Sequence, residues 1–258
     1  MSFYPGFDVS PVYNPLGFKY GETAFGSIVE NRTLDSIRES LIDLNCDGPE
    51  IVYSIAMDIG SKQDKPEIMN RNLLYGAVTY AKGQLGKEPV RSQGHIHAIS
   101  QSCRMSTCEV YEIWDGSAYV YMQETAQDDP GRCFAVFAKP GDIVIVPPGW
   151  AHCTISTDTT KNMTFGAWCV RDYGFDYDDV RQHNGLAWVP VVKNGKITFL
   201  SNKKYHTRTL IKKHPRVYIE FGLETGEPIY TQFAENPEKF LFVSKPQSVA
   251  EKWKHFIP

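Results

Sequence analysis

Four side chains that can bind a metal ion lie in two glycine-bounded segments, residues 94–116 and 141–156: His95, His97, Glu109 and His152. Side chains alternate between the faces of a strand, so the two histidines of the first segment project to the same side. The glutamate and the third histidine must then arrive from neighbouring strands, as they can when a sheet closes into a small barrel. Three imidazoles and one carboxylate suit a divalent transition ion such as Fe, Mn, Ni or Zn.

The rest of both segments is typical of short strands between turns. Residues 109–115 are rich in aromatic and β-branched side chains and end at Gly116. Residues 143–146 are apolar and precede Pro147-Pro148-Gly149, which favours a turn. Three similar runs are separated by turn residues at the spacing of an all-β barrel: residues 117–124, 133–140 and 163–170.

The flanking regions predict further elements. We expect residues 1–30 to form an extended arm around the barrel, and residues 33–44 to form a helix capped by Asn31 or Thr33. Between these and the first motif we expect strands at residues 50–60 and 73–83, joined by a polar connection. The last part of the chain predicts three strands and a terminal helix, in the order 196–200, 216–222, 240–244 and 248–256. This tail could extend the sheet, join a dimer interface or cover the site.

Composition excludes several classes of partner. The net charge is −3 and no basic run stands out, so we expect neither nucleic acid nor a membrane as a partner. The N-terminus lacks the pattern of a signal peptide and no apolar run has the length of a membrane span, which predicts a cytoplasmic protein. The six scattered cysteines are expected to be reduced thiols.

The two segments resemble the two motifs of the cupin superfamily, and more closely those of the cupin-type (archaeal-type) glucose-6-phosphate isomerases. The similar phrases here are SQGHIH, CEVYEIWDGSA, PGDIVIVPPGWAH and DYGFDY. Two departures are Ser156, where the superfamily has Asn, and the long interval before Glu109, which must loop out. The resemblance implies a cupin double-stranded β-helix (jelly-roll barrel) with a few peripheral helices. It divides the chain into an N-terminal arm and helix, the barrel, and a C-terminal extension, at residues 1–48, 49–190 and 191–258.

The same resemblance implies an aldose-ketose isomerase that interconverts glucose 6-phosphate and fructose 6-phosphate, through a cis-enediol or a hydride shift. The ligands of its ion would be His95, His97, Glu109 and His152, with Fe expected and Mn, Ni or Zn as alternatives. Glu109 and Tyr177 would be catalytic. The phosphate of the sugar phosphate would be held by Tyr53, Thr79, Ser92 and Gly94. The resemblance also implies a homodimer.

One departure from the isomerase pattern keeps two other functions open. Phe175 stands where the family has a histidine, and His183 or Tyr173 could replace that group. A cupin dioxygenase could use the same four ligands, and three tryptophans would suit its apolar substrate: Trp114, Trp150 and Trp168. A non-catalytic sugar-binding cupin, with a structural metal, is the third hypothesis.

Overall fold

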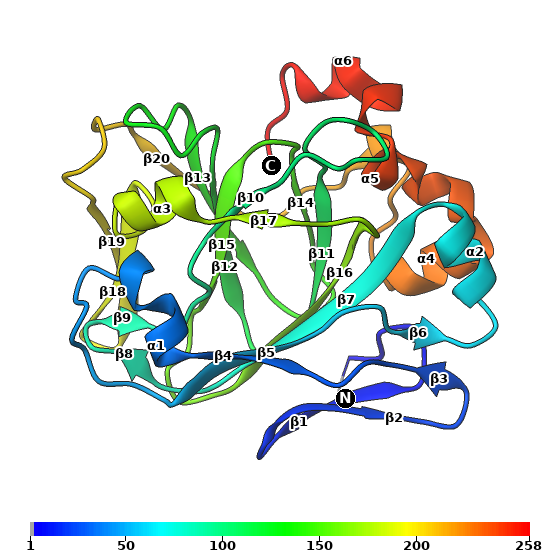
Figure 1. Ribbon diagram of the computed structural model, residues 1–258, viewed down its shortest axis with the longest axis horizontal. Coiled ribbons are helices and arrows are strands. Elements are labelled where there is room, and N and C mark those ends of the chain that lie inside the picture. The colour runs from blue at the N-terminus through cyan, green and yellow to red at the C-terminus, as the bar shows by residue number, and fades with distance from the viewer. Residues whose placement is uncertain (1–2) are drawn as a thin grey trace.

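A computed structural model describes residues 3–258 and shows two antiparallel β-sheets that face each other as a jelly roll, with short helices outside them (Figure 1). The first sheet has the strand order β14 (Ile143–Val146), β11 (Glu109–Asp115), β16 (Met163–Val170), β7 (Leu73–Tyr80), β5 (Ile51–Ala56) and β4 (Glu30–Thr33). The second has the order β15 (Ala151–Ser156), β12 (Ala118–Gln123), β13 (Cys133–Ala138) and β20 (Leu210–Lys213), and only its pair β13–β20 is parallel among the described strands. The predicted all-β cupin fold is confirmed.

The remaining elements are short. The other strands are β1 (Val9–Tyr13), β2 (Leu16–Tyr20), β3 (Ala24–Phe25), β6 (Gly60–Ser61), β8 (Gln84–Leu85), β9 (Glu88–Pro89), β10 (Ile96–His97), β17 (Phe175–Asp176), β18 (Trp188–Lys193) and β19 (Lys196–Ser201). The α-helices are α1 (Leu34–Ile37), α2 (Lys65–Asn70), α3 (Asp178–Gln182), α4 (Ile229–Glu235), α5 (Leu241–Ser244) and α6 (Ala250–Trp253). No helix among residues 3–258 is long and apolar enough to cross a membrane. All six cysteines are free thiols.

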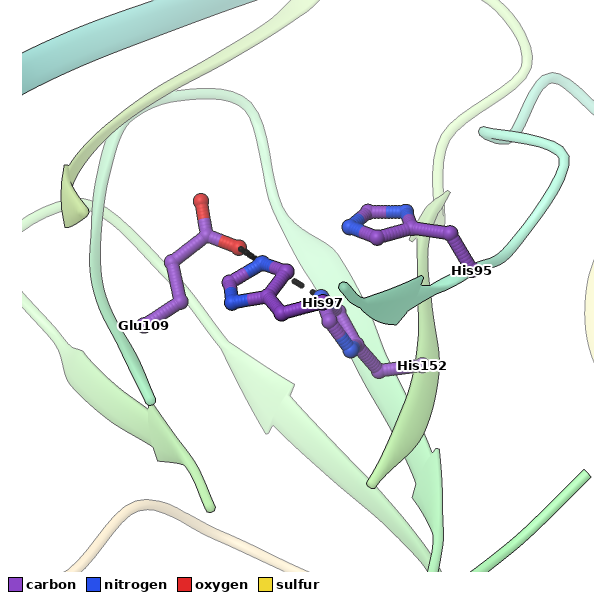
Figure 2. A group of neighbouring side chains, drawn as sticks. All are labelled: His95, His97, Glu109 and His152. Carbon is purple, nitrogen blue, oxygen red and sulfur yellow. Dashed lines mark hydrogen bonds and ion pairs between the residues drawn. The ribbon is translucent and has the colours of Figure 1, made fainter. Parts of the chain in front are cut away.

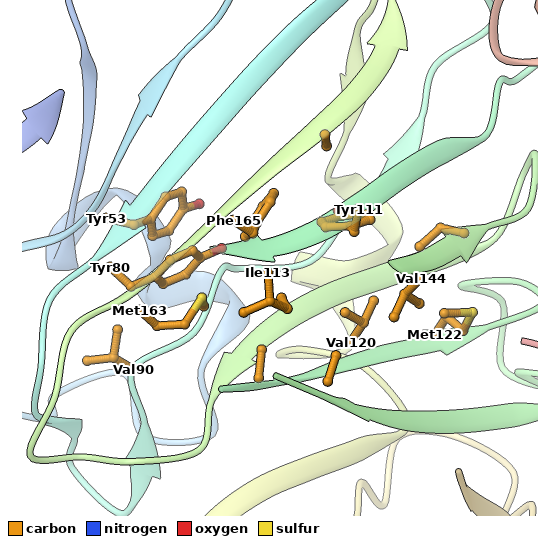
Figure 3. Packing of buried hydrophobic residues seen from close by; sticks show 14 of the residues in the cluster. Tyr53, Tyr80, Val90, Tyr111, Ile113, Val120, Met122, Val144, Met163 and Phe165 are labelled. Atoms are coloured by element: carbon orange, nitrogen blue, oxygen red, sulfur yellow. The ribbon is translucent and has the colours of Figure 1, made fainter. Parts of the chain in front are cut away.

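The interior between the two sheets is one apolar core. Figure 3 shows large side chains from both sheets packed there, among them Tyr80 of β7, Tyr111 of β11 and Met122 of β12. Alternation along β7 divides its side chains between two cores: Leu74 and Tyr80 belong to the interior, whereas Tyr75 belongs to the core on the outer face. The central strands of the first sheet, β11, β16 and β7, are therefore buried on both faces, whereas the edge strand β4 is partly exposed.

The C-terminal helices cover the outer face of the first sheet. The indole ring of Trp168 on β16 lies 4.3 Å from the ring centre of Phe233 and 5.5 Å from that of Tyr230, both on α4. Its Nε1 donates a hydrogen bond to the carbonyl oxygen of Ile229 at 3.2 Å. The N-terminal arm packs on the same core through Phe7. Of the three roles expected for the tail, the structure shows one: a short part extends a sheet as β20. The helices cover a sheet face rather than the cavity, whose lining includes none of the described residues beyond Tyr177.

Four secondary-structure predictions need correction. The helix expected at residues 33–44 ends as a short 3₁₀ turn at Ser40, although Thr33 caps it as predicted, with its side chain accepting a hydrogen bond from the Ser36 N–H. It ends there because a buried ion pair takes the next backbone groups: Arg91 donates to the Ser40 carbonyl and Glu88 accepts from the Ile42 N–H. The polar connection expected between the strands at residues 50–60 and 73–83 contains a short helix, α2. The strands expected at residues 216–222 and 240–244 are instead helical turns.

The tail segments fold as turns that bury part of their apolar side chains in one aromatic cluster: Tyr218, Phe221, Phe240, Phe242 and Val243. Residues 240–244 lie between Pro237 and Pro246, which limit strand pairing, and the buried rings of Phe240 and Phe242 lie 6.4 Å apart. Uninterrupted apolar runs carry no period that separates a strand from a buried helix.

Close packing on the outer face explains a glycine in the middle of β16. A methyl group at Gly166 would lie 2.4 Å from the Trp114 ring and 2.4 Å from the Tyr75 hydroxyl. We expect Gly166→Ala to lower the free energy of unfolding by about 1–3 kcal/mol because these large rings must shift. Urea denaturation of both variants checks this. Gly17→Ala is the control, since its methyl group would meet the Val29 side chain at 3.7 Å, an ordinary contact; an equal loss in both would contradict the packing argument.

Candidate metal centre

The structure brings the four candidate ligands together at one end of the barrel interior (Figure 2). One ligand atom from each residue lies within 4.8 Å of the others: His95, His97, Glu109 and His152. His95 and His152 are cross-strand neighbours, because each backbone N–H donates to the other's carbonyl at 3.1 and 3.0 Å. Residues 98–108 loop out between β10 and β11, as predicted, and Ser100 ties this loop to Asp172. Glu109 then begins β11.

The imidazole orientations leave their Nε2 atoms available to an ion. The Nδ1 atom of His97 lies 3.0 Å from the Thr107 carbonyl oxygen, and that of His152 lies 3.0 Å from the Trp150 carbonyl oxygen. A carbonyl only accepts, so each ring carries a proton on Nδ1, which leaves Nε2 as the atom that would bind an ion.

Both Nε2 atoms face the carboxylate of Glu109. The Oε2 atom of Glu109 lies 3.1 Å from the Nε2 of His97 and 3.4 Å from that of His152. The Nε2 of His95 is buried without a hydrogen-bond partner among the described residues. A cation placed among these atoms would satisfy all of them. The residues therefore fit a divalent ion, and this buried group could hold one.

Electrostatics keeps His95 and Glu109 in the forms that bind a metal. Burial and the neighbouring imidazoles lower the pKa of His95 well below its usual value, so that ring stays neutral. Burial opposes ionisation of Glu109, but the interactions with His152 and His97 outweigh it and hold the pKa of the carboxyl well below its usual range. Two further donors orient this carboxylate: the Tyr111 hydroxyl donates to Oε2 at 2.8 Å, and the Cys169 thiol donates to Oε1 at 3.3 Å.

A small cavity of about 60 Å³ adjoins the ligands. Hydroxyl groups line part of its wall: Tyr53, Tyr80, Ser92, Tyr111, Thr154 and Tyr177. Apolar side chains line the remainder: Ile55, Met57, Val78, Phe165 and Phe175. Pockets that hold small ligands usually enclose about 300–1,000 Å³, so side chains at the mouth must move before a sugar phosphate can enter.

The structure places only some of the predicted phosphate-binding residues at this cavity. Tyr53, Ser92 and Tyr177 line it. Gly94 is not among the lining residues; its φ of +89° favours glycine, and a methyl group there would lie 3.2 Å from Leu186. Thr79 is a correction: it sits on the opposite face of β7, where its hydroxyl contacts the Thr164 hydroxyl at 3.2 Å. The next residue on β7, Tyr80, lines the cavity instead.

Strand alternation identifies the residues that the sequence interpretation missed. Thr154 follows His152 by two positions and Tyr111 follows Glu109 by two, so each shares a face with a ligand. The Ser92 hydroxyl accepts a hydrogen bond from the Thr154 N–H at 3.0 Å, which joins β15 to the segment before His95. The two-residue period of a strand, counted from His152 and from Glu109, places Thr154 and Tyr111 at the site.

Neither predicted substitute for the missing histidine faces the cavity. The ring of His183 stacks on Tyr205 at 4.1 Å, and its Nε2 lies 3.1 Å from Asp128. Tyr173 is partly exposed and packs on Phe175 from outside, with ring centres 5.3 Å apart. Phe175 itself packs edge-on against His95 at 4.5 Å and so covers the ligand group from one side.

Comparisons with known proteins agree with the geometry. The family model described as glucose-6-phosphate isomerase (GPI) matches residues 37–208, more than half of the chain, and this range contains all four ligands. The chain belongs to the glucose-6-phosphate isomerase family. The matched range also includes the cavity-lining residues of β5, β7, β11, β15 and β16.

Individual members of this glucose-6-phosphate isomerase family are distant relatives. The glucose-6-phosphate isomerase of Thermococcus litoralis is 28% identical over 159 residues, which cover 62% of this chain and 75% of that protein. That of Pyrococcus horikoshii is 27% identical over 134 residues, which cover 52% of this chain and 65% of that protein, slightly less than two thirds of its length. Among solved structures, an oxalate oxidase aligns with 48% of this chain and 54% of its own at a TM-score of 0.36 and 13% identity, too weak a likeness to inform the function.

Proposed function

We propose that this protein is a metal-dependent aldose-ketose isomerase that interconverts glucose 6-phosphate and fructose 6-phosphate. One observation carries the proposal: the four candidate ligands converge beside a cavity lined by hydroxyl groups, within the range that matches the isomerase family. The relatives at 25–28% identity are named glucose-6-phosphate isomerase. The ion is proposed to be Fe, with Mn, Ni or Zn as alternatives.

The reaction moves a carbonyl between C1 and C2 of the sugar. A bound divalent ion supplies Lewis-acid polarisation of the oxygens on both carbons, which acidifies the neighbouring C–H protons. His95, His97, Glu109 and His152 would hold the ion. The low pKa of Glu109 keeps its carboxylate ionised, the form that a metal ligand or a general base needs. The Tyr111 and Cys169 donors hold that carboxylate in one orientation beside the cavity.

In the enediol route Glu109 would take the proton from one carbon and return it to the other. In the hydride-shift route Glu109 would act only as a ligand. Burial raises the pKa of Tyr177, so its phenol stays protonated at neutral pH and can donate a hydrogen bond to a sugar oxygen. Phe175 cannot move a proton, so the proposed chemistry assigns that work to Glu109 and the phenols.

One observation favours a second candidate, a non-catalytic sugar-binding cupin. Phe175 replaces a group that can titrate and covers His95, and the cavity is small. No comparable observation favours the dioxygenase, because the tryptophans invoked for it point elsewhere. Trp114 and Trp168 belong to the outer core, and Trp150 stacks on Phe134 at 5.9 Å. A homodimer and a cytoplasmic location remain predictions.

Metal removal tests the proposed function. We expect the purified chain to contain about one divalent ion and to convert fructose 6-phosphate to glucose 6-phosphate. Chelation should abolish that turnover, and return of Fe or Mn should restore it, because both proposed routes need the ion. Elemental analysis and a coupled assay before and after chelation make the measurement. Turnover that persists in metal-free protein would overturn the mechanism, and bound metal without turnover would support the sugar-binding alternative.

A further inference from the structure

A sugar phosphate carries a charge of nearly −2, and the cavity wall offers no lysine or arginine to meet it. The wall residues, all within the described part of the chain, provide phenols, hydroxyls, apolar groups, one imidazole and the Glu109 carboxylate. Hydroxyl groups alone leave a phosphate dianion uncompensated in a site from which water is excluded. A cationic side chain just beyond the wall would add a charge-assisted contact to the phosphate.

Arg32 is placed to provide that charge. It lies on the edge strand β4, directly opposite Tyr53 in the strand register. Tyr53 and Tyr177 both line the cavity, and the positive charge of Arg32 lowers the pKa of both phenols against the larger effect of burial. The Arg32 side chain is only 20% exposed, so it is directed toward the molecule rather than into solvent.

The ion pair that Arg32 makes is one that a ligand can replace. Its carboxylate partner is Glu30, at 3.0 Å on the same strand, and the Glu30 side chain is 65% exposed. Pairs with a solvent-exposed partner contribute about 0–1 kcal/mol, so exchanging this carboxylate for a phosphate costs little. A planar guanidinium can also bind phosphate oxygens in a bidentate manner.

A second arginine, Arg181, lies beside the phenol of Tyr177. Arg181 on α3 lies over the Tyr177 ring, with its guanidinium carbon 5.0 Å from the ring centre. Its Nε and Nη2 atoms each lie 3.3 Å from the side-chain oxygen of the buried Gln93. The carboxylate nearest to Arg181 is that of Glu39, at 3.6 Å, and this side chain is 74% exposed. Two guanidinium groups thus lie beside the phenols of the cavity wall, and within residues 3–258 each is ion-paired only with an exposed carboxylate.

We propose that Arg32 binds the phosphate of the substrate at the cavity mouth, and that Arg181 positions Tyr177 beside it. The inference rests on the proposed function and deepens it, since it names the group that selects a phosphorylated sugar over a neutral one. The family model begins at residue 37, so the match does not assign this role to Arg32. Side chains at the mouth must rearrange to admit a ligand, and each arginine neighbours a phenol that lines the cavity, Arg32 beside Tyr53 and Arg181 over Tyr177.

Arg32→Gln in the metal-loaded full-length chain tests the proposal. Calorimetric binding of fructose 6-phosphate and of inorganic phosphate should weaken by about 10–100-fold, as expected for loss of a charge-assisted hydrogen bond. Binding of neutral fructose should not change. Arg32→Lys should restore part of the affinity for phosphate, since it keeps the charge but not the bidentate geometry. Arg208→Gln is the control, because Arg208 pairs with the exposed Asp129 outside the cavity wall.

The outcomes separate the two proposals. Phosphate binding that falls in Arg32→Gln and not in Arg208→Gln supports the role of Arg32, even in a wild-type chain that shows no isomerisation; the proposed function alone would then fail. Equal phosphate affinity in the wild type and Arg32→Gln would overturn the role of Arg32 and leave the isomerase intact. A wild-type chain that binds neither fructose 6-phosphate nor phosphate would overturn both. Thermal unfolding of each variant shows whether it is folded.

Discussion

Replacing Glu109 with glutamine is expected to lower kcat/KM for fructose 6-phosphate by about 10²–10⁴-fold, the range that a positioned general base contributes. The substitution keeps the shape of the side chain and its contact with the Tyr111 hydroxyl but removes the negative charge. It therefore removes both the proposed base and one anionic ligand of the ion. Steady-state kinetics with excess Fe or Mn, together with elemental analysis of bound metal, measures the two effects separately.

Tyr111→Phe is the matched control for this prediction. It removes one donor to Oε2 and leaves the carboxylate, its charge and the second donor from Cys169 in place. We expect a smaller loss of activity, because the orientation of Glu109 is then only partly released. A Glu109→Gln variant that binds metal and turns over at the wild-type rate would exclude Glu109 as the base and leave the hydride-shift route.

The metal centre could be predicted from the sequence because its geometry is local. Two histidines two positions apart share a strand face, and glycine and proline turns define where the neighbouring strands return. The residues of the cavity wall were predicted less well, because they depend on which face of β7 is turned inward. Thr79 was placed in the cavity, yet it lies opposite, whereas Tyr80 lines the wall. A shift of one residue moves every side chain of a strand to the other face.

Contacts between distant segments account for what the sequence could not show. Arg32 lies opposite Tyr53 only because β4 joins the sheet beside β5. The early end of the first helix depends on the buried pair of Arg91 and Glu88, about 50 residues further on. The C-terminal turns depend on the aromatic cluster around Trp168, which no local period reveals.

A buried carboxylate beneath the C-terminal helices should make stability depend on pH. Glu112 lies on β11 with its side chain on the outer face, 1% exposed. Its Oε1 accepts a hydrogen bond from the Ile229 N–H at 3.0 Å, at the start of α4, while its Oε2 has no hydrogen-bond partner among the described residues. Burial raises the pKa of Glu112 to about 8, against the smaller effect of the bond from Ile229.

The direction of the pH dependence follows from the difference in the pKa of Glu112 between the unfolded and the folded chain. In the unfolded chain the carboxyl ionises near its usual pKa of 4.5, whereas in the folded chain it keeps its proton up to about pH 8. Folding therefore takes up a proton between these values, and the free energy of unfolding falls as pH rises through this window. Stability from the protonated form is fully present below pH 4.5 and is lost by about pH 8. A shift of this size corresponds to at most about 5 kcal/mol.

Glu112→Gln should remove this dependence, because the amide keeps an acceptor for the Ile229 N–H and cannot ionise. We expect the variant to exceed the wild type in free energy of unfolding by about 2 kcal/mol or more at pH 8.5, with the difference shrinking toward pH 5. Urea denaturation at pH 5, 7 and 8.5 measures it. Glu235→Gln, at an exposed position on α4, is the control. Parallel pH profiles for Glu112→Gln and the wild type would show that Glu112 ionises without cost in the folded chain, and the unpartnered Oε2 would then have to reach water.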